Sequence, residues 1–306
     1  MNSDWQRRLR EDDILIMDGG TGSELQRRGV GMHKDAWSGA AALTDKKLLR
    51  EIHADYIRAG ADVITTNTFG TSRFVLESAG LENEFRRINK MAIEVAIEAL
   101  DLAAQSPIAI AGSISCLPPR LDVSAYPGEQ AERDAYRELA EILVEGGVDL
   151  IALEMMEDSY HARMAAEAAF EVGVPVWLGV SCKLADDGEA LVGFDFPDTP
   201  ISEPLGTLLP FDFDVVSVMH TDPDAVGNAL REVKTRWTGP VGVYPELGDF
   251  SAPNWNFSNL MTPMEFAERA TQWVSQGARL LGGCCGTTPE HIRALRDALP
   301  GLLAAR

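Results

Sequence analysis

The sequence predicts a (βα)8 barrel. Eight short apolar segments alternate with longer helical patterns along the chain, which is typical of parallel sheets with crossover helices. An open, doubly wound sheet is the alternative, but no GxGxxG motif follows the first strand, which weakens its dinucleotide-binding version. A length of 306 residues suits one barrel, so we expect a single domain over residues 1–306. The predicted strands are residues 14–17, 62–66, 108–112, 150–153, 174–180, 215–219, 241–244 and 279–281.

The boundaries of the predicted helices carry their own signals. Thr44 or Asp45 suits the cap of one helix and Gly60 its end, while Pro263 suits the first turn of another and Gly277 its stop. We expect helices over residues 45–59, 81–100, 132–145, 159–171, 224–236 and 263–276, and long loops over residues 116–128 and 183–210. Loops of this length in a barrel are usually functional covers or dimer contacts, so a homo-oligomer is compatible with the sequence.

Composition excludes several partners. The formal net charge of −20 repels phosphate backbones, so we expect no nucleic-acid partner. No segment approaches eighteen uninterrupted apolar residues, so we expect no membrane span, and the charged amino-terminal stretch does not resemble a signal peptide. Four cysteines in a chain of this length do not form a disulfide framework. We therefore expect a reduced, cytoplasmic protein.

The residues that follow the strands are the candidate site, because a barrel of this kind carries its chemistry where its strands end. Cys284 and Cys285 stand between glycines after the last strand, and a catalytic zinc needs three protein ligands plus an open position. His220, one residue past the sixth strand, is the predicted third ligand. Cys182, at the neighbouring strand end, is the substitute. The competing interpretations are a buried structural cysteine pair and a histidine that packs in the core.

Several strand-end motifs resemble those of one family. They are Asp-Gly-Gly-Thr-Gly-Ser-Glu-Leu at residues 18–25, together with residues 53–56, 59–62, 65–69, 146–154, 243–245 and 282–286. In this order, over nearly the whole chain, they resemble the zinc-dependent homocysteine S-methyltransferase family. The resemblance implies a (βα)8 barrel that moves a methyl group from a donor to the thiol of homocysteine, held as a thiolate on zinc.

The resemblance implies roles for the other strand-end residues. Asp18 and Glu154 would act in catalysis and hold the ammonium group of an amino-acid substrate; the alternative is that they accept hydrogen bonds from backbone amides or a helix terminus. Gly19 and Gly20 would let the backbone approach that ligand closely. Asn67 would orient substrate, or else cap a strand end.

The resemblance also points to the methyl donor. Trp37 matches an aromatic residue that faces the donor in relatives, and an aromatic face attracts onium methyl groups, although packing of a loop onto the barrel is the competing role. The chain ends soon after the last helix, so we expect a directly used small donor: S-methylmethionine, S-adenosylmethionine or a betaine. The expected partners are therefore a small-molecule thiol and this donor.

The sequence departs from the family pattern at the site. Met219-His220 replaces the usual Asn-Cys, Glu246 replaces the usual asparagine after Tyr-Pro, and Met155 follows Glu154. A neutral imidazole in place of a thiolate acidifies an incoming thiol but leaves the bound thiolate less nucleophilic. A different thiol acceptor, a demethylase and a non-catalytic homologue thus stay open. A lyase or aldolase with zinc as Lewis acid would need a rim lysine or second base, and only Lys183 lies there.

Overall fold

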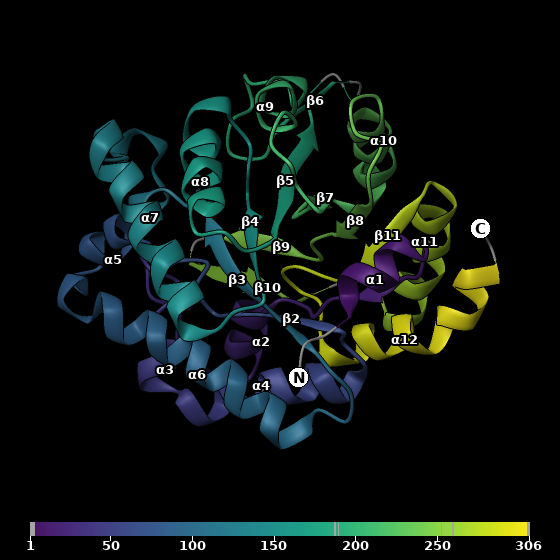
Figure 1. The fold of residues 1–306 in the computed structure, drawn as a ribbon, viewed down its shortest axis with the longest axis horizontal. Helices are drawn as coiled ribbons and strands as arrows, with labels where there is room; N and C mark the ends of the chain where they lie inside the picture. The colour runs from purple at the N-terminus through teal and green to yellow at the C-terminus, as the bar shows by residue number, and fades with distance from the viewer. Residues whose placement is uncertain (1–3, 187, 189, 252, 259, 305–306) are drawn as a thin grey trace.

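The computed structural model describes residues 4–186, 188, 190–251, 253–258 and 260–304, and it confirms the predicted (βα)8 barrel (Figure 1). Eight parallel strands lie side by side in the order β1-β11-β8-β7-β5-β4-β3-β2. A parallel bridge between Met17, directly after β1, and Val63 of β2 joins the two ends of this order and closes the barrel. The barrel strands are β1 (Leu15–Ile16), β2 (Val63–Thr65), β3 (Ala109–Ser115), β4 (Leu150–Glu154), β5 (Val176–Leu184), β7 (Val215–Met219), β8 (Val241–Tyr244) and β11 (Ala278–Leu281).

The helices surround the barrel and largely match the expected segments. The helix that begins after Asp45 ends at Gly60, whose φ of 106° is the left-handed conformation that glycine adopts without strain. Thr262 and Glu265 form a capping box at the start of the helix whose first residue is Pro263. The helices are α1 (Trp5–Arg10), α2 (Thr21–Arg27), α3 (Ala41–Thr44), α4 (Lys46–Ala59), α5 (Arg73–Ser78), α6 (Phe85–Ala103), α7 (Glu129–Gly146), α8 (Ser159–Glu171), α9 (Ser202–Leu208), α10 (Pro223–Lys234), α11 (Pro263–Ser275) and α12 (Pro289–Ala304), with 3-10 turns η1 (Glu82–Glu84), η2 (Pro119–Leu121) and η3 (Val123–Ala125).

Two apolar cores hold the barrel together. The larger one lies between the strands and the surrounding helices, and the smaller one fills the barrel interior. In the interior, Trp5 of α1 packs edge-on against Trp177 of β5, with ring centroids 5.1 Å apart. This contact fills the amino-terminal end of the barrel, so the opposite end, where the strands finish, is the one that holds polar residues.

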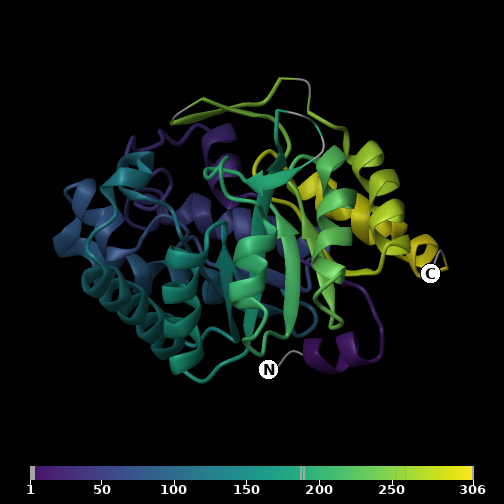
Figure 2. The same cartoon turned by 90° about the horizontal axis from the view of Figure 1, so that it is seen from above.

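Three features of the loops differ from the expected irregular stretches. The segment 183–210 contains a strand, β6 (Leu191–Gly193), which pairs antiparallel with the end of β5, and it also contains α9. The segment 116–128 contains the turns η2 and η3. A hairpin of β9 (Asp249–Ser251) and β10 (Asn254–Asn256) follows β8 and extends across the end of the barrel that carries the strand termini (Figure 2). These segments build the mouth of the barrel.

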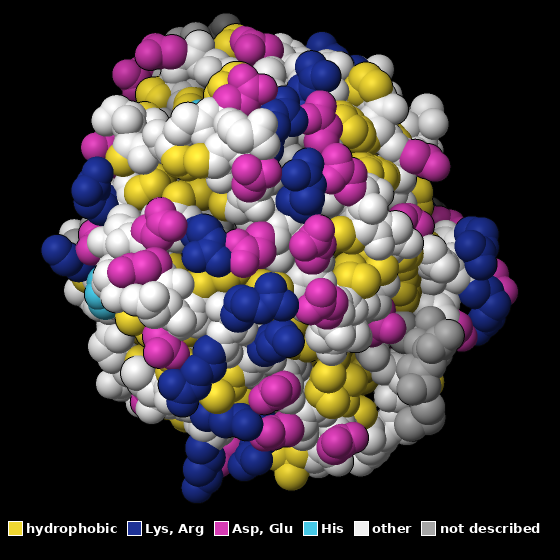
Figure 3. All heavy atoms as spheres, turned by 60° about the vertical axis from the view of Figure 1, so that its left-hand side comes forward, with side chains coloured by type: hydrophobic (Ala, Val, Ile, Leu, Met, Phe, Trp, Pro, Cys, Tyr) yellow, Lys and Arg dark blue, Asp and Glu magenta, His cyan; other side chains and the backbone are white. Residues whose placement is uncertain are grey.

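Charged side chains of both signs are mixed on the face drawn in Figure 3, which is the left-hand side of Figure 1. Ion pairs join α7 to its neighbours there, including Arg73 with Glu138 at 2.7 Å and Arg137 with Glu171 at 2.8 Å. The acidic excess of the chain is thus not collected into one patch on this face. Among the described residues, no helix has both the length and the apolar character needed to cross a membrane.

Candidate active site

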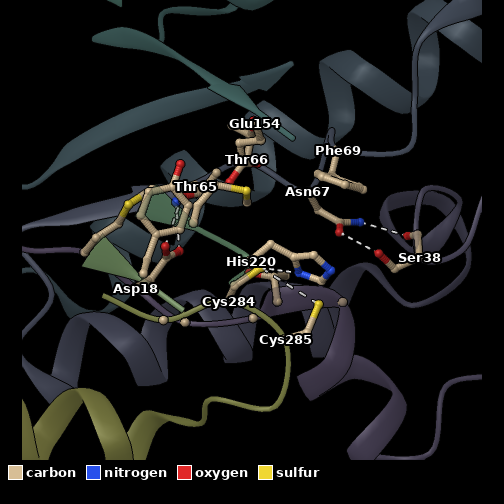
Figure 4. A pocket seen from close by; sticks show the side chains of 18 of the residues that line it. Asp18, Ser38, Thr65, Thr66, Asn67, Phe69, Glu154, His220, Cys284 and Cys285 are labelled. Atoms are coloured by element: carbon tan, nitrogen blue, oxygen red, sulfur yellow. Dashed lines mark hydrogen bonds between the residues drawn. The ribbon is translucent and has the colours of Figure 1, made fainter. Parts of the chain in front are cut away.

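A pocket opens at the carboxyl ends of the barrel strands, where the sequence predicted the site (Figure 4). It encloses about 630 Å³ of empty space, including its opening to solvent. The loops after β1, β2, β4, β7, β8 and β11 all contribute to its wall, so residues far apart in the sequence meet in one place. Every predicted site residue lines it: Asp18, Gly19, Gly20, Trp37, Asn67, Glu154, His220, Cys284 and Cys285.

The three predicted zinc ligands point toward one another at one side of this pocket (Figure 4). His220 Nδ1 lies 3.4 Å from Cys284 Sγ, and Cys284 Sγ lies 3.9 Å from Cys285 Sγ. All three ligand atoms are within 4.8 Å of one another. A tetrahedral zinc with bonds of about 2.3 Å to sulfur and about 2.0 Å to nitrogen separates its ligands by roughly 3.5–3.8 Å. The cluster therefore has donor types that suit zinc, and two of its three spacings, 3.4 and 3.9 Å, are close to those of a tetrahedral zinc site.

The glycine-rich loop after β11 fixes both sulfur atoms. Gly286 has a φ of 80°, and a side chain there would collide with the backbone of Leu247. The loop is also tied down by hydrogen bonds: Cys284 N–H donates to Pro245 O at 2.8 Å, and Leu247 N–H donates to Cys285 O at 2.6 Å. The local sequence thus holds two adjacent cysteines with their side chains toward the pocket rather than in a flexible turn.

The electrostatics of the cluster favour a thiolate at Cys284. A hydrogen bond from Cys285 and the charge of His220 hold the pKa of Cys284 well below its usual range, against the opposing effect of burial. Burial raises the pKa of Cys285 well above its usual range. Burial lowers the pKa of His220, but the charges of Cys284 and Glu246 outweigh it and bring this pKa to about 9. Without metal, Cys284 is thus the reactive thiol of the pair.

Asp18 and Glu154 face the pocket from β1 and β4. Asp18 accepts hydrogen bonds from the backbone N–H and the hydroxyl of Thr65, at 2.8 and 3.0 Å, and Glu154 accepts one from the Ser113 hydroxyl. Burial raises the pKa of Asp18 to about 7, and burial together with the charge of Cys284 raises that of Glu154 to about 8. Among the described residues no basic side chain forms an ion pair with either carboxyl, and two such carboxyls with raised pKa values suit a cationic ligand between them.

Gly19 and Gly20 line the pocket and also bring two loops together. A Cβ on Gly19 would lie 2.7 Å from the Thr287 hydroxyl, and a Cβ on Gly20 would lie 2.5 Å from the carbonyl oxygen of Cys284. Gly20 N–H donates to the Thr287 hydroxyl at 3.1 Å. The absence of side chains at these positions therefore allows the loop after β1 to pack directly against the loop that carries the cysteines.

Asn67 and Trp37 are connected through Ser38. The Asn67 amide donates to Ser38 O at 2.9 Å and accepts from the Ser38 hydroxyl at 3.1 Å, so it anchors the segment that carries Trp37. The Trp37 ring packs against Phe69 and Phe250, with centroids 5.9 and 6.1 Å apart. Trp37 thus packs its loop onto the barrel and also lines the pocket, while its role toward a methyl donor stays a prediction.

A second pocket adjoins the first on the outer side of His220, and sequence analysis did not predict it. The two pockets share Trp37, Phe69 and His220 in their walls. The remaining wall comes from the segment 33–35, the ends of the long loops and the hairpin. It has a cluster of aromatic rings with two carboxylates nearby, and Lys34 also lines it. This part of the wall includes Asp35, Met155, Phe194, Asp195, Phe250 and Trp255.

Cys182, the substitute ligand, does not join the cluster. It is fully buried on β5, where its backbone N–H donates to the Thr221 hydroxyl at 3.1 Å. Sequence analysis missed a different neighbour of His220: Glu246 Oε2 lies 3.4 Å from His220 Nε2. The position of Glu246 directly after a strand was the available signal, because residues at adjacent strand ends meet in a closed barrel.

Comparison with known proteins agrees with this geometry. The sequence profile of the homocysteine S-methyltransferase family matches residues 15–299. The chain belongs to the homocysteine S-methyltransferase family. The expected resemblance and the expected methyltransferase class of enzyme are thereby confirmed at the level of the family.

Individual members of the homocysteine S-methyltransferase family match over most of their length. Homocysteine S-methyltransferase 2 of Zea mays is 28% identical over 93% of this chain and 89% of its own. Selenocysteine methyltransferase of Astragalus bisulcatus is 28% identical over 93% of this chain and 92% of its own. The metallated form of the homocysteine methyltransferase MmuM of Escherichia coli is 26% identical, with a TM-score of 0.77 over 95% of this chain and 98% of that one.

Proposed function

We propose that this enzyme transfers a methyl group from a small onium donor to a zinc-bound amino-acid thiol, with homocysteine as acceptor and methionine as product. The observation that carries the proposal is the meeting of two unlike pockets at His220. One pocket offers carboxylates and sulfur ligands, and the other offers aromatic rings. A reaction between an amino-acid thiol and a methylated cation needs both kinds of surface. The two must adjoin where the acceptor sulfur meets the methyl group of the donor.

The acceptor pocket supports an amino-acid thiol. Asp18 and Glu154 face it together from β1 and β4, and ionised carboxylates bind an ammonium group. The sulfur end of the ligand would then reach the cluster of His220, Cys284 and Cys285. Homocysteine fits this division into an ammonium end and a thiol end, and it is named as the substrate of several relatives.

His220, Cys284 and Cys285 would hold zinc, as their donor types and spacing support. When bound, zinc would supply a Lewis-acidic position at which a thiol loses its proton at neutral pH. The solved structure of the E. coli relative is that of its metallated form, which supports a metal in the family. The close approach of the two glycine-rich loops would fix the position of the sulfur ligands and so the direction of the acceptor sulfur.

The second pocket supports an onium donor. Trp37, Phe250 and Trp255 form its aromatic side, and ring faces attract methyl groups that carry positive charge. Trp37, Met155 and His220, all in its wall, have φ values of 51°, 57° and 42°. Non-glycine residues in this conformation cost roughly 1–3 kcal/mol each and cluster at functional sites. The strained backbone of these three residues therefore lies in the wall of the pocket that we assign to the donor.

The proposed transfer balances without any further reactant. The acceptor sulfur forms a bond to the methyl carbon while the bond from that carbon to the donor sulfur or nitrogen breaks. The donor keeps the electron pair and leaves as a neutral thioether or amine, and the acceptor proton passes to solvent. Phe194 and Trp255 flank His220, with ring centroids 4.6 and 5.7 Å from its own, and would shield the reacting atoms from water.

The direct test is methionine formation from homocysteine with S-methylmethionine, S-adenosylmethionine or glycine betaine as donor. We expect turnover with at least one donor, by a protein that contains one zinc per chain. His220→Ala should lose most of this zinc. Equal zinc content in both proteins would remove His220 from the ligand set, and absence of methionine with every donor would remove homocysteine as the acceptor.

A different acceptor is the second candidate, because two relatives are named for selenocysteine. A selenol would reach the same ligands and would be methylated in the same way. Parallel assays with selenocysteine and homocysteine at equal concentration distinguish the two acceptors. A chain that binds zinc and amino acid but methylates neither would be a non-catalytic homologue.

We further propose a single domain in a reducing, cytoplasmic setting, supported by four free cysteines.

A further inference from the structure

The imidazole of His220 is held from four sides. Its Nδ1 lies 3.4 Å from Cys284 Sγ, and its Nε2 lies 3.4 Å from Glu246 Oε2. The rings of Phe194 and Trp255 pack against it at interplanar angles of 62° and 88°. The side chains of His220 and Glu246 are only 11% and 13% exposed, so solvent screens their interaction weakly.

The fold places Glu246 beside His220. Met219 of β7 pairs with Tyr244 of β8, and each of the two residues follows one of these adjacent strands. The backbone N–H of His220 donates to Tyr244 O at 3.1 Å, and that of Glu246 donates to Thr221 O at 3.4 Å. The two loops therefore support each other, and the contact between the side chains does not depend on a long flexible segment.

We propose that Glu246 is a positioning residue that makes His220 a metal ligand through Nδ1 and restores negative charge to the site. This inference rests on the proposed function, because it concerns the same zinc. Glu246 touches His220 rather than the reacting atoms, and nothing in the sequence motifs assigned it a role.

The first part of the proposal follows from the tautomers of histidine. A neutral imidazole carries one proton, so only one of its nitrogens has a lone pair for a metal. A carboxylate beside Nε2 attracts the proton to that nitrogen, and Glu246 Oε2 lies 3.4 Å from it. The lone pair then lies on Nδ1, the atom that faces Cys284. Ligating histidines usually have such a partner.

The second part of the proposal concerns charge. Two thiolates and a neutral imidazole cancel the two positive charges of zinc, so the ligands alone would leave the site neutral. The carboxylate of Glu246 leaves one net negative charge across the site and its neighbour. Through its contact with Nε2 it also makes the imidazole a stronger donor of electrons. Glu246 would thus offset the loss of nucleophilicity that a histidine ligand brings to a thiol-activating zinc.

The test measures zinc affinity by competition with a chromophoric chelator, using the full chain and no methyl donor. We expect Glu246→Ala to weaken zinc binding by about 10–100-fold, as is usual for the loss of such a partner. Glu246→Gln keeps an acceptor oxygen but no charge, so it should fall between Glu246→Ala and the wild type. In cobalt-loaded protein, Glu246→Ala should change the visible absorption spectrum, because the histidine ligand is no longer held in one orientation.

A double-mutant cycle separates this role from a structural one. In a His220→Cys background the imidazole is gone, so Glu246→Gln should weaken zinc binding much less than it does in the wild type, with only the effect of the lost charge remaining. The same loss in both backgrounds, or equal zinc affinity of wild type and Glu246→Ala, would overturn the inference and leave the proposed function standing. A wild-type protein that binds no zinc would instead defeat the proposed function itself. Thermal unfolding of each metal-free variant checks that it folds, and Glu246→Asp is the alternative if Glu246→Ala does not.

Discussion

A Cβ atom on Gly20 would lie 2.5 Å from the carbonyl oxygen of Cys284, so the loop after β1 and the cysteine loop touch through their backbones. We expect Gly20→Ala to push the cysteine loop away from His220. Zinc affinity should fall by more than tenfold, and the free energy of unfolding by about 1–3 kcal/mol, as is typical of overpacking. Chelator competition and denaturant titration measure both effects.

Gly31→Ala is the matched control for this prediction. A Cβ there meets no atom within 4 Å, so both quantities should stay at their wild-type values. If Gly20→Ala behaved like Gly31→Ala, the two loops would have more freedom than their close approach indicates.

Glu154→Gln should separate activity from stability. The pKa of Glu154 is raised from 4.5 to about 8, so the folded protein holds its proton more tightly than the unfolded chain does. Stability therefore falls as pH rises through this range, and a permanently neutral side chain removes that loss. We expect Glu154→Gln to be more stable than wild type at pH 9, by about 3–5 kcal/mol, and equally stable at pH 4. Its KM for the acceptor should rise at least tenfold. Lower stability at pH 9 would contradict the raised pKa.

Binding of methionine should depend on pH through Asp18 and Glu154. Methionine has the ammonium group of the proposed acceptor but no thiol, so its binding reports the carboxylates without a titrating sulfur. Only ionised carboxylates attract the ammonium, and their pKa values in the empty pocket are about 7 and about 8. The Kd measured by calorimetry should therefore fall as pH rises from 6 to 8.5. Asp18→Asn together with Glu154→Gln should abolish this dependence, and a Kd that rises over this range would place the ammonium elsewhere.

Phe250→Leu should affect the donor more than the acceptor. Phe250 lines the aromatic pocket, packs against Trp255 with ring centroids 5.1 Å apart, and is 41% exposed, so its replacement costs little stability. Loss of one ring face from a cation site costs about 0.5–2 kcal/mol, so the KM for the donor should rise by roughly 2- to 30-fold. The KM for the acceptor should stay within a factor of two.

Phe211→Leu is the control, because Phe211 packs on Phe170, away from both pockets, and should change neither value. Equal effects of Phe250→Leu on both substrates would argue against a separate donor pocket.

Cys284 should be the first thiol to react in metal-free protein. Its pKa is lowered well below the usual range, and it is partly exposed, whereas Cys116, Cys182 and Cys285 are buried. At pH 7 we expect iodoacetamide to label Cys284 at least ten times faster than the others, because the thiolate is the reactive form. Zinc should suppress this labelling, and mass spectrometry of peptides identifies the site. Cys284→Ser should remove the fast phase, and fast labelling that zinc leaves unchanged would separate the thiol from the metal site.

The barrel could be predicted from strand periodicity, and the meeting of His220, Cys284 and Cys285 from their positions at strand ends. Each strand of a barrel ends on the same rim, so finding the strands also brings His220 and Cys284 to one edge. The contact between His220 and Glu246 could not be predicted from strand positions alone, since it depends on the conformation of two loops. The aromatic pocket was beyond reach for the same reason: Phe194 and Trp255 come from segments whose strands are three residues long, too short for a periodic signal.

The packing of Trp5 against Trp177 also bears on kinetics. In the part of the chain that the structure describes, these rings obstruct the amino-terminal end of the barrel, so ligands must pass through the mouth where the two pockets lie. Both substrates would then enter, and both products leave, through the same opening. With one shared opening, the order of substrate binding and product release would affect turnover. A product that dissociates slowly would block binding of the next substrates.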